Sequence, residues 1–475
     1  MMWIHRSRAS LDPMTTLTHT LLSENNFSDH PLGGRLDVIL PSDARYDTAR
    51  LAWNLSADQH PAAIWQATSV QDVQDALVYA RERGWRVTVQ TTGHYARILP
   101  DLSTTLLLKL SLDGQQVTVD PARRTARVPS GAVWSDVIDV VAPHGLTAMH
   151  GSAPSVGVIG YLAGGGLGFY GRAHGLACNH VLAFDVVTAD GRLRHVDAEH
   201  DPELFYALRG GGGGYAVVTA VEIELLPYAE VTAGAMFFAV DHAPALLRAW
   251  RAWTEDADES ISTTFRLLNL PPLPQVPEPL RGVQTICIDG VALKAGEAER
   301  LAGALESVAP PILGGFGPMP APAVTHLHGD PEAPTPGIGD GILLDGLDDQ
   351  AIDAFLSVGG DASLAVAELR HLGGALARSS QGAGALDRFD GEFLLYAAGV
   401  PGAPAPAAEL NACLDRFLEA MAPWASGTRF WSFAERNPSL DGAITPQALR
   451  RITRTRAVVD PDGLFIAPRD ADIAA

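Results

Sequence analysis

The sequence predicts an α+β fold of two or three domains. Its 475 residues exceed the length of one typical domain, which is about 100–200 residues. Up to residue 228, segments with the hydrophobic periodicity of a helix are followed by short runs in which apolar and polar residues alternate, as in a strand. From Val231 to about Thr428 the composition shifts to alanine, leucine and proline. We expect an N-terminal extension (1–34), a first domain (35–228), an inserted second domain (229–428) and a C-terminal segment (429–475).

The first domain is expected to begin with a helix and a strand. Ser69 is a predicted N-cap, and the helix ends at Gly84. The strand that follows ends in the turn Gln90–His94. Further strands are expected over Leu106–Leu110, Val117–Val119, Thr125–Val128, Phe184–Thr188, Leu193–Val196 and Val217–Leu225, and further helices over Trp134–Ala142 and from Asp201, as N-cap, to Leu208.

The second domain and the C-terminal segment add longer elements. A helix is expected over Ala243–Trp253, and strands are expected over Glu368–His371 and Phe393–Tyr396. In the C-terminal segment, Phe430–Glu435 is interpreted as a strand, and a basic helix over Leu449–Val458 ends at an Asp-Pro-Asp-Gly turn.

Composition excludes several classes of function. The chain has 34 Lys and Arg against 55 Asp and Glu, a formal charge of -21, which disfavours nucleic acid and anionic membranes as partners. Three separated cysteines offer neither a disulfide framework nor a cysteine metal site. No apolar run reaches 18 residues, no secretory leader is evident and no phosphate-binding P-loop occurs. We expect a soluble, cytoplasmic protein, and the sequence does not predict its oligomeric state.

Three glycine-rich segments are the strongest signals for a ligand. They are Gly93–His94, Gly151–Gly168 and Gly210–Gly214, and each adjoins a predicted strand. Each alone is compatible with a tight turn, but together they favour a large phosphate-bearing cofactor held by backbone amides. Gly166–Gly171 matches GxGxxG, yet it lacks the strand-to-helix context of a Rossmann site.

Five motifs occur in an order that resembles the berberine bridge enzyme-like family of FAD-linked oxidases. They are TTGHY, ARVPSGAVW, HGSAPSVGVIGYLAGGGLGFYG, DPELFYALRGGGGGYAVVT and RAVVDPDGLF. The resemblance implies a PCMH-type FAD-binding domain in two parts (35–228 and 429–475). It further implies that residues 229–428 form the substrate domain, with an antiparallel sheet covered by helices.

The resemblance also implies a set of cofactor residues. His94 matches the histidine that the family attaches to the flavin 8α-methyl group, so a covalent FAD is expected. Backbone contacts with the cofactor are expected mainly from three loops. The residues of this expected site are Thr91, Thr92, Gly93, His94, Tyr95, Gly151, Ser152, Ser155, Gly157, Val158, Gly160, Tyr161, Gly165, Gly214 and Val218.

The chain departs from the family pattern at functional positions. Ala153 stands where many relatives carry a second, cysteinyl flavin link, so no bond is expected there. Cys178 is interpreted as a small buried residue. Phe430 stands where the family has a phenol that could act as base, so another base is needed.

Candidates for the missing base lie mainly in the second domain. Glu368 and Arg370 share one face of a strand, although they could form only a solvated ion pair. Tyr396, Glu435 and Tyr161 are the other candidates. We assign Glu368, Arg370, Tyr396 and Glu435 as the candidate catalytic residues.

The resemblance implies an oxidase that moves a substrate hydride to flavin N5 and is reoxidised by O₂. Aromatic residues favour a hydrophobic secondary metabolite as the small-molecule substrate, and two or three of them are expected to line the cleft; the candidates are Phe237, Phe238, Phe265, Phe393, Tyr396, Phe430 and Trp431. Two alternatives stay open. One is a flavin-containing enzyme that catalyses a non-redox cyclisation or cycloaddition, motivated by Phe430, and the other is a dehydrogenase with a different electron acceptor.

Overall fold

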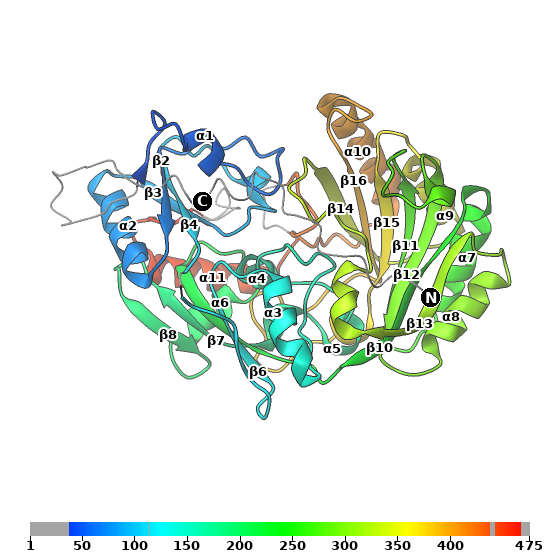
Figure 1. The fold of residues 1–475 in the computed structure, drawn as a ribbon, viewed down its shortest axis with the longest axis horizontal. Helices are drawn as coiled ribbons and strands as arrows, with labels where there is room; N and C mark the ends of the chain where they lie inside the picture. Colours follow the sequence, from blue (N-terminus) through cyan, green and yellow to red (C-terminus); the bar gives the residue numbers. More distant parts are fainter. Residues whose placement is uncertain (1–37, 113, 438–441, 467–475) are drawn as a thin grey trace. The chain divides into compact units, whose positions relative to one another are not determined.

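The computed structural model describes residues 38–112, 114–437 and 442–466. Contacts divide the chain into two units, Met1–Val38 and Ile39–Ala475, and apart from Val38 the features below belong to the second. The predicted extension over 1–34 lies outside the described residues. Three sheets and the helices between them confirm the α+β class (Figure 1).

The first sheet has four strands in the order β1-β2-β4-β3. Its strands β2, β4 and β3 are parallel, and helix α2 makes the crossover from β2 to β3, with β4 lying between them. Ser69 caps α2 as predicted, because its side chain accepts a hydrogen bond from the Asp72 amide. The elements are β1 (Val38–Ile39), α1 (Tyr46–Ala49), β2 (Ala63–Ala67), α2 (Val70–Glu82), β3 (Arg86–Gln90) and β4 (Thr105–Leu110).

The second sheet has five antiparallel strands in the order β5-β6-β9-β7-β8. Helix α6 begins at Pro202 and Asp201 occupies its N-cap position, as predicted, but the Asp201 side chain makes no capping hydrogen bond. Asp201 has φ 54°, outside the extended region of N-cap residues, and its carboxylate faces Arg194 at 3.6 Å. The elements are β5 (Thr118–Asp120), β6 (Thr125–Pro129), α3 (Trp134–Val141), α4 (Val158–Ala163), α5 (Gly171–His174), β7 (Val181–Val187), β8 (Leu193–Asp197), α6 (Pro202–Leu208) and β9 (Val217–Glu224).

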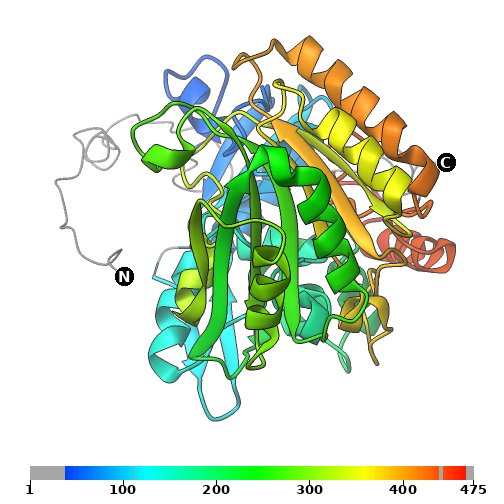
Figure 2. The same cartoon turned by 90° about the vertical axis from the view of Figure 1, so that its right-hand side faces the viewer.

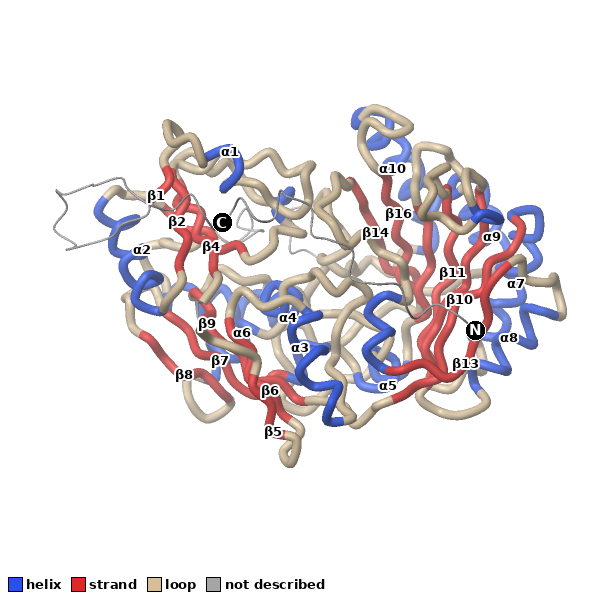
Figure 3. Tube along the Cα trace, in the orientation of Figure 1, coloured by secondary structure: helices blue, strands red, loops and turns tan. Residues whose placement is uncertain are grey.

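The third sheet has seven strands in the order β13-β10-β12-β11-β15-β16-β14. Helices cover one of its faces, as Figures 2 and 3 show. The strands are β10 (Glu230–Ala239), β11 (Ile261–Asn269), β12 (Gln284–Ala292), β13 (Leu313–Pro320), β14 (Ile338–Leu344), β15 (Val366–His371) and β16 (Phe393–Gly399). The helices are α7 (Ala243–Thr254), α8 (Glu297–Glu306), α9 (Asp349–Gly359) and α10 (Ala407–Met421).

Side-chain alternation gives this third sheet two different faces. Ala367 and Leu369 of β15 pack with the helices in one hydrophobic core. Because side chains alternate along a strand, Glu368 and Arg370 lie on the opposite face. Cross-strand register places Glu368 between Arg266 of β11 and Tyr396 of β16. The face turned away from the helices thus carries a row of buried polar side chains.

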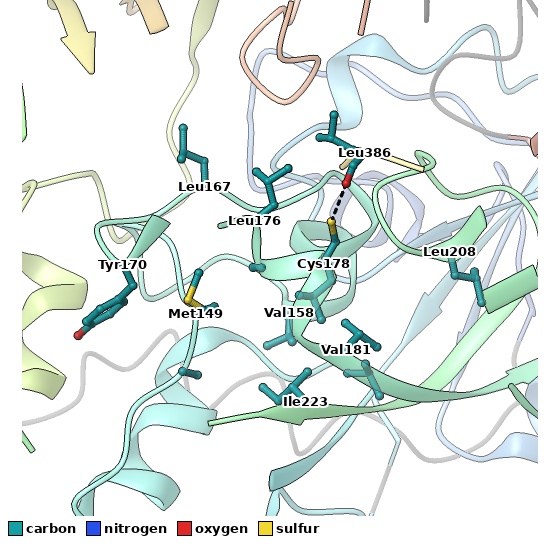
Figure 4. Close-up of a cluster of buried hydrophobic side chains, with 14 of the residues drawn as sticks. Met149, Val158, Leu167, Tyr170, Leu176, Cys178, Val181, Leu208, Ile223 and Leu386 are labelled. Atoms are coloured by element: carbon teal, nitrogen blue, oxygen red, sulfur yellow. Dashed lines mark hydrogen bonds between the residues drawn. The ribbon is translucent and has the colours of Figure 1, made fainter. Parts of the chain in front are cut away.

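A second hydrophobic core joins the five-stranded sheet to the polar-bearing face of the third sheet. Cys178 lies inside it, fully buried, with its thiol 3.6 Å from the Leu386 carbonyl oxygen (Figure 4). The interpretation of Cys178 as a small buried residue is confirmed. Burial raises the pKa of its thiol to about 12, so it is not a nucleophile at neutral pH.

The C-terminal segment lies against the first sheet. The Val87 amide donates to the Leu464 carbonyl at 2.7 Å, and the Ile466 amide donates to the Val87 carbonyl at 2.8 Å. Helix α11 (Pro446–Val459) precedes this contact and is capped by Thr445. None of the described helices combines the length and hydropathy needed to cross a bilayer.

The strand expected over Phe430–Glu435 is wrong. This segment is a series of turns in which the amides of Phe433 and Ala434 donate to the Phe430 carbonyl. The Trp431 indole also donates to the Gly164 carbonyl at 2.7 Å, which fixes the turn against a glycine loop. Short 3₁₀ turns complete the fold at Ala96–Ile98, Ala142–His144, Ala177–His180, Val240–His242, Glu278–Leu280, Ala321–His326, Gly374–Ala377 and Ala422–Trp424.

Candidate active site

The three glycine-rich segments and the third sheet enclose a cavity of about 540 Å³. Loop residues 91–95 and 212–214 line it, together with most of 151–167. Arg370, Tyr396 and the turn around Phe430 line it from the other side. A volume in this range is typical of ligand and cofactor sites.

Most of the predicted cofactor residues line this cavity. They are Thr91, Thr92, Gly93, His94, Tyr95, Gly151, Ser152, Gly157, Gly160, Tyr161, Gly214 and Val218. Ser155, Val158 and Gly165 are not in the lining. Val158 is buried in the core, Gly165 faces Leu386, and Ser155 Oγ lies 3.5 Å from His94 Nε2.

Bare backbone at two glycines fits a large, flat ligand. A Cβ added to Gly160 or Gly213 would meet no atom within 4 Å, so open space faces the backbone there. Gly93 is required for a different reason, because its φ is +83° and a Cβ would lie 2.8 Å from the Ala52 Cβ. The loops thus form a cradle into which a cofactor can approach the main chain.

Unpartnered polar atoms also point to a ligand. Gln90 Oε1, Ser130 Oγ and Tyr161 Oη are buried without a hydrogen-bond partner among the described residues, and all three residues line the cavity. Burying such groups unpaired costs about 1–3 kcal/mol each. The polar edges and phosphates of FAD would supply the missing partners, so the residues present fit this cofactor.

His94 is held by its neighbours in one orientation. Its Nδ1 lies 2.8 Å from Thr92 Oγ1, and its ring stacks on Trp53 with centroids 4.0 Å apart. Burial lowers the pKa of His94 to about 4, although Asp330 acts to raise it. The imidazole is therefore neutral at neutral pH and retains a nucleophilic lone pair.

Ala153 lines the same cavity, where its methyl group offers no sulfur for a covalent link. The lining includes none of the three cysteines.

Tyr396 and Glu435 form a polar pair in the cavity wall. The Tyr396 hydroxyl donates to Glu435 Oε1 at 2.7 Å. Burial raises the pKa of Glu435 to about 7, with Asp340 adding to this effect and the Tyr396 hydrogen bond opposing it. Burial and the Glu435 carboxylate raise the pKa of Tyr396. A carboxyl that titrates near neutral pH is suited to general acid–base work.

Glu368 does not line the cavity but lies behind Arg370 in a buried charge network. Its carboxylate accepts from Arg370 Nε at 2.7 Å and from His328 Nε2 at 3.0 Å. His328 Nδ1 in turn faces Asp289 Oδ2 at 2.9 Å, and Arg266 donates to the same oxygen at 2.6 Å. Glu368 and Arg370 are thus a buried pair, not a solvated one. Burial acts to raise the pKa of Glu368, but Arg370 and His328 outweigh it and lower it.

Three of the seven candidate aromatic residues line the cavity, namely Tyr396, Phe430 and Trp431. Phe238, Phe265 and Phe393 instead pack in the core beneath the helices. Phe430 contacts Phe389 and Phe433, with ring centroids 4.8 and 5.5 Å apart.

Sequence reasoning missed several lining residues. Ser130 belongs to the ARVPSGAVW motif but was not predicted as a site residue, whereas Trp53 and Asp330 lie outside every motif. Asp330 Oδ2 accepts from Ser152 Oγ at 2.6 Å. Trp53 and Asp330 reach the cavity through tertiary contacts, for which the sequence carries no local signal.

Comparisons with known proteins agree with this geometry. Residues 61–197 match the model of the FAD binding domain family. The chain is 33% identical to (R)-6-hydroxynicotine oxidase of Paenarthrobacter nicotinovorans over 195 residues. The aligned region covers 41% of this chain and 42% of that protein. The chain thus spans less than half the length of this curated relative.

Solved structures share the fold over most of the chain. Physcomitrella patens BBE-like 1 superposes with a TM-score of 0.79 at 20% identity, covering 92% of this chain and 96% of that one. Glucooligosaccharide oxidase from Acremonium strictum, described with a 6-S-cysteinyl, 8α-N1-histidyl FAD, gives a TM-score of 0.73 at 20% identity, covering 91% and 96%. Residues 61–197 therefore match the FAD binding domain family, and the chain shares its fold with these solved structures.

Proposed function

We propose that this chain is an FAD-dependent oxidase that acts on a hydrophobic small molecule and uses O₂ as electron acceptor. The observation that carries the proposal is the Tyr396–Glu435 pair, 2.7 Å apart, in the wall of a cavity that fits FAD. The curated relatives include an oxidase and proteins named as FAD-linked oxidoreductases, which supports the same activity. Residues 35–228 and 429–475 would hold the cofactor, and 229–428 the substrate, in a cytoplasmic protein.

Bound FAD would accept a hydride from the substrate carbon and return two electrons to O₂, which with two protons becomes hydrogen peroxide. The chain's own residues handle the proton. Tyr396 accepts the proton of the substrate hydroxyl or amine while its own phenolic proton passes to Glu435. The pair would therefore act as the base at a site where Phe430 stands in place of the family's phenol.

His94 is the proposed site of covalent attachment. Its neutral ring is held by Thr92 and Trp53 at the edge of the cavity, and the glucooligosaccharide oxidase described above carries a histidyl flavin link. Ala153 allows no second link at its position.

Anaerobic mixing of the purified flavoprotein with a panel of aromatic and alicyclic alcohols and amines tests the activity. We expect a substrate to bleach the flavin absorbance near 450 nm, a wavelength typical of oxidised flavins, and air to restore it with about one peroxide per turnover. A substrate that is cyclised without bleaching would favour the non-redox alternative. Bleaching that a quinone reverses and air does not would favour the dehydrogenase.

A further inference from the structure

The guanidinium of Arg370 is held at the cavity wall with part of its hydrogen-bonding capacity free. Its side chain is 12% exposed and lines the cavity. Among the described residues, its recorded hydrogen bonds run from Nε to Glu368 and between Nη2 and His328 Nε2, 3.2 Å apart. Whether the contact with His328 is a hydrogen bond decides how many N–H groups of Arg370 remain for a ligand.

His328 cannot accept a hydrogen bond from Arg370 when both of its ring nitrogens carry protons. Nδ1 lies 2.9 Å from an Asp289 oxygen and Nε2 lies 3.0 Å from a Glu368 oxygen. Two carboxylates facing the two nitrogens favour the imidazolium, which only donates. The Nη groups of Arg370 are then left with no carboxylate acceptor among the described residues.

The charges around Arg370 do not by themselves demand an anion. Arg266, His328 and Arg370 are balanced by Asp289, Glu368 and Asp330, whose carboxylate accepts from Ser152. The argument therefore rests on geometry. A guanidinium held at Nε by a buried carboxylate presents its other edge as a planar fork, which matches an oxyanion.

The surroundings of the fork indicate what the anion is attached to. The Arg370 guanidinium lies over the Phe433 ring, 4.8 Å from its centroid. Phe433 also contacts Phe430 and, edge to face at 5.1 Å, Tyr396. An aromatic ring placed against these side chains would bring its acidic substituent to Arg370 and its neighbouring carbon to the proposed base.

We propose that Arg370, held at Nε by Glu368, selects substrates that carry a carboxylate next to an aromatic ring system. The proposal identifies a substrate class and in that sense rests on the proposed function. Its test measures binding without turnover, so its failure is distinguishable from a failure of the oxidase activity.

Isothermal titration calorimetry of the holoprotein with 2-naphthoate and with its neutral isostere 2-naphthamide is the test. We expect wild type to bind the naphthoate at least about tenfold more tightly, and Arg370→Gln to remove that difference while leaving naphthamide binding within about twofold. Arg370→Lys, which keeps the charge but loses the fork, is expected to retain part of the preference. Arg378→Gln, at an exposed ion pair with Glu259, is the control and leaves both affinities unchanged.

Equal binding of the two probes by wild type would overturn the proposal without any variant. It would also be overturned if Arg370→Gln released flavin or shifted its midpoint potential while the preference for naphthoate persisted, because Arg370 would then serve the cofactor.

Discussion

Tyr396 and Glu435 lie 39 residues apart in the chain, yet their side chains share one hydrogen bond. Both residues were among the four candidate catalytic residues, but the sequence could not pair them, because their hydrogen bond depends on the turn that follows Phe430, which was interpreted as a strand. Arg370 and Glu368 could be placed on one strand face, since strict alternation requires it. Their buried partners His328, Asp289 and Arg266 could not be predicted, because they come from a loop and two other strands.

If Glu435 receives the proton, activity depends on its ionised form. Burial raises the pKa of Glu435 to about 7, so kcat/KM should rise with pH through this value and level off above it. Glu435→Gln should abolish this dependence, and Tyr396→Phe should lower kcat by about 10²–10³-fold. Stopped-flow flavin reduction between pH 5 and 9 measures both effects. An unchanged pH profile in Glu435→Gln would remove Glu435 from the mechanism.

The same burial affects stability. Because the folded pKa of Glu435 is raised above its ordinary value of 4.5, its favourable contribution is complete below about pH 4.5 and is lost as pH rises through about 7. Glu435→Gln should therefore stabilise the protein more at pH 8 than at pH 5, by up to about 3 kcal/mol. Thermal unfolding of both proteins at the two pH values measures this. An equal change in Tm at both pH values would contradict a raised pKa of Glu435 in the folded protein.

At the scale of elements, strand β14 contributes to the site through a glycine. A Cβ added to Gly339 would overlap the Tyr396 hydroxyl across the β14–β16 pair. Gly339→Ala should therefore displace the phenol and reduce the rate of flavin reduction about as strongly as Tyr396→Phe, by about 10²-fold or more. Gly317→Ala, in edge strand β13 with no atom within 4 Å of its added Cβ, is the matched control. Equal rates in the two alanine variants would contradict the placement of Tyr396.

Helix caps show where local sequence signals suffice and where they do not. Ser69→Ala removes a real cap and should cost about 1 kcal/mol, a typical value for N-caps. Asp201→Gly, which suits the left-handed backbone at this position, removes only an exposed ion pair with Arg194 and should cost less than about 0.5 kcal/mol. Urea unfolding of the two variants compares them directly. Both positions have the residue type of a cap, but the backbone of Asp201 is in the left-handed region, which the sequence does not reveal.

For the whole described chain, the glycine-rich segments predicted loops that line the cavity, and the hydrophobic periodicity together with the five ordered motifs predicted the fold. For Gly93 and Gly213 the reason is conformational, since both have a positive φ that favours glycine. Trp53 and Asp330 reach the cavity through packing between distant segments, and nothing in their local sequence indicates this.

The central claim is that this cavity binds FAD with His94 at its covalent edge. The measurement that tests it most directly is the absorption spectrum of purified wild type and His94→Ala before and after acid precipitation. The account predicts yellow colour in both native proteins that stays with the wild-type pellet and moves to the supernatant in the variant. Flavin released from wild type would contradict the covalent link, and a colourless protein that FAD cannot reconstitute would contradict the flavin site itself.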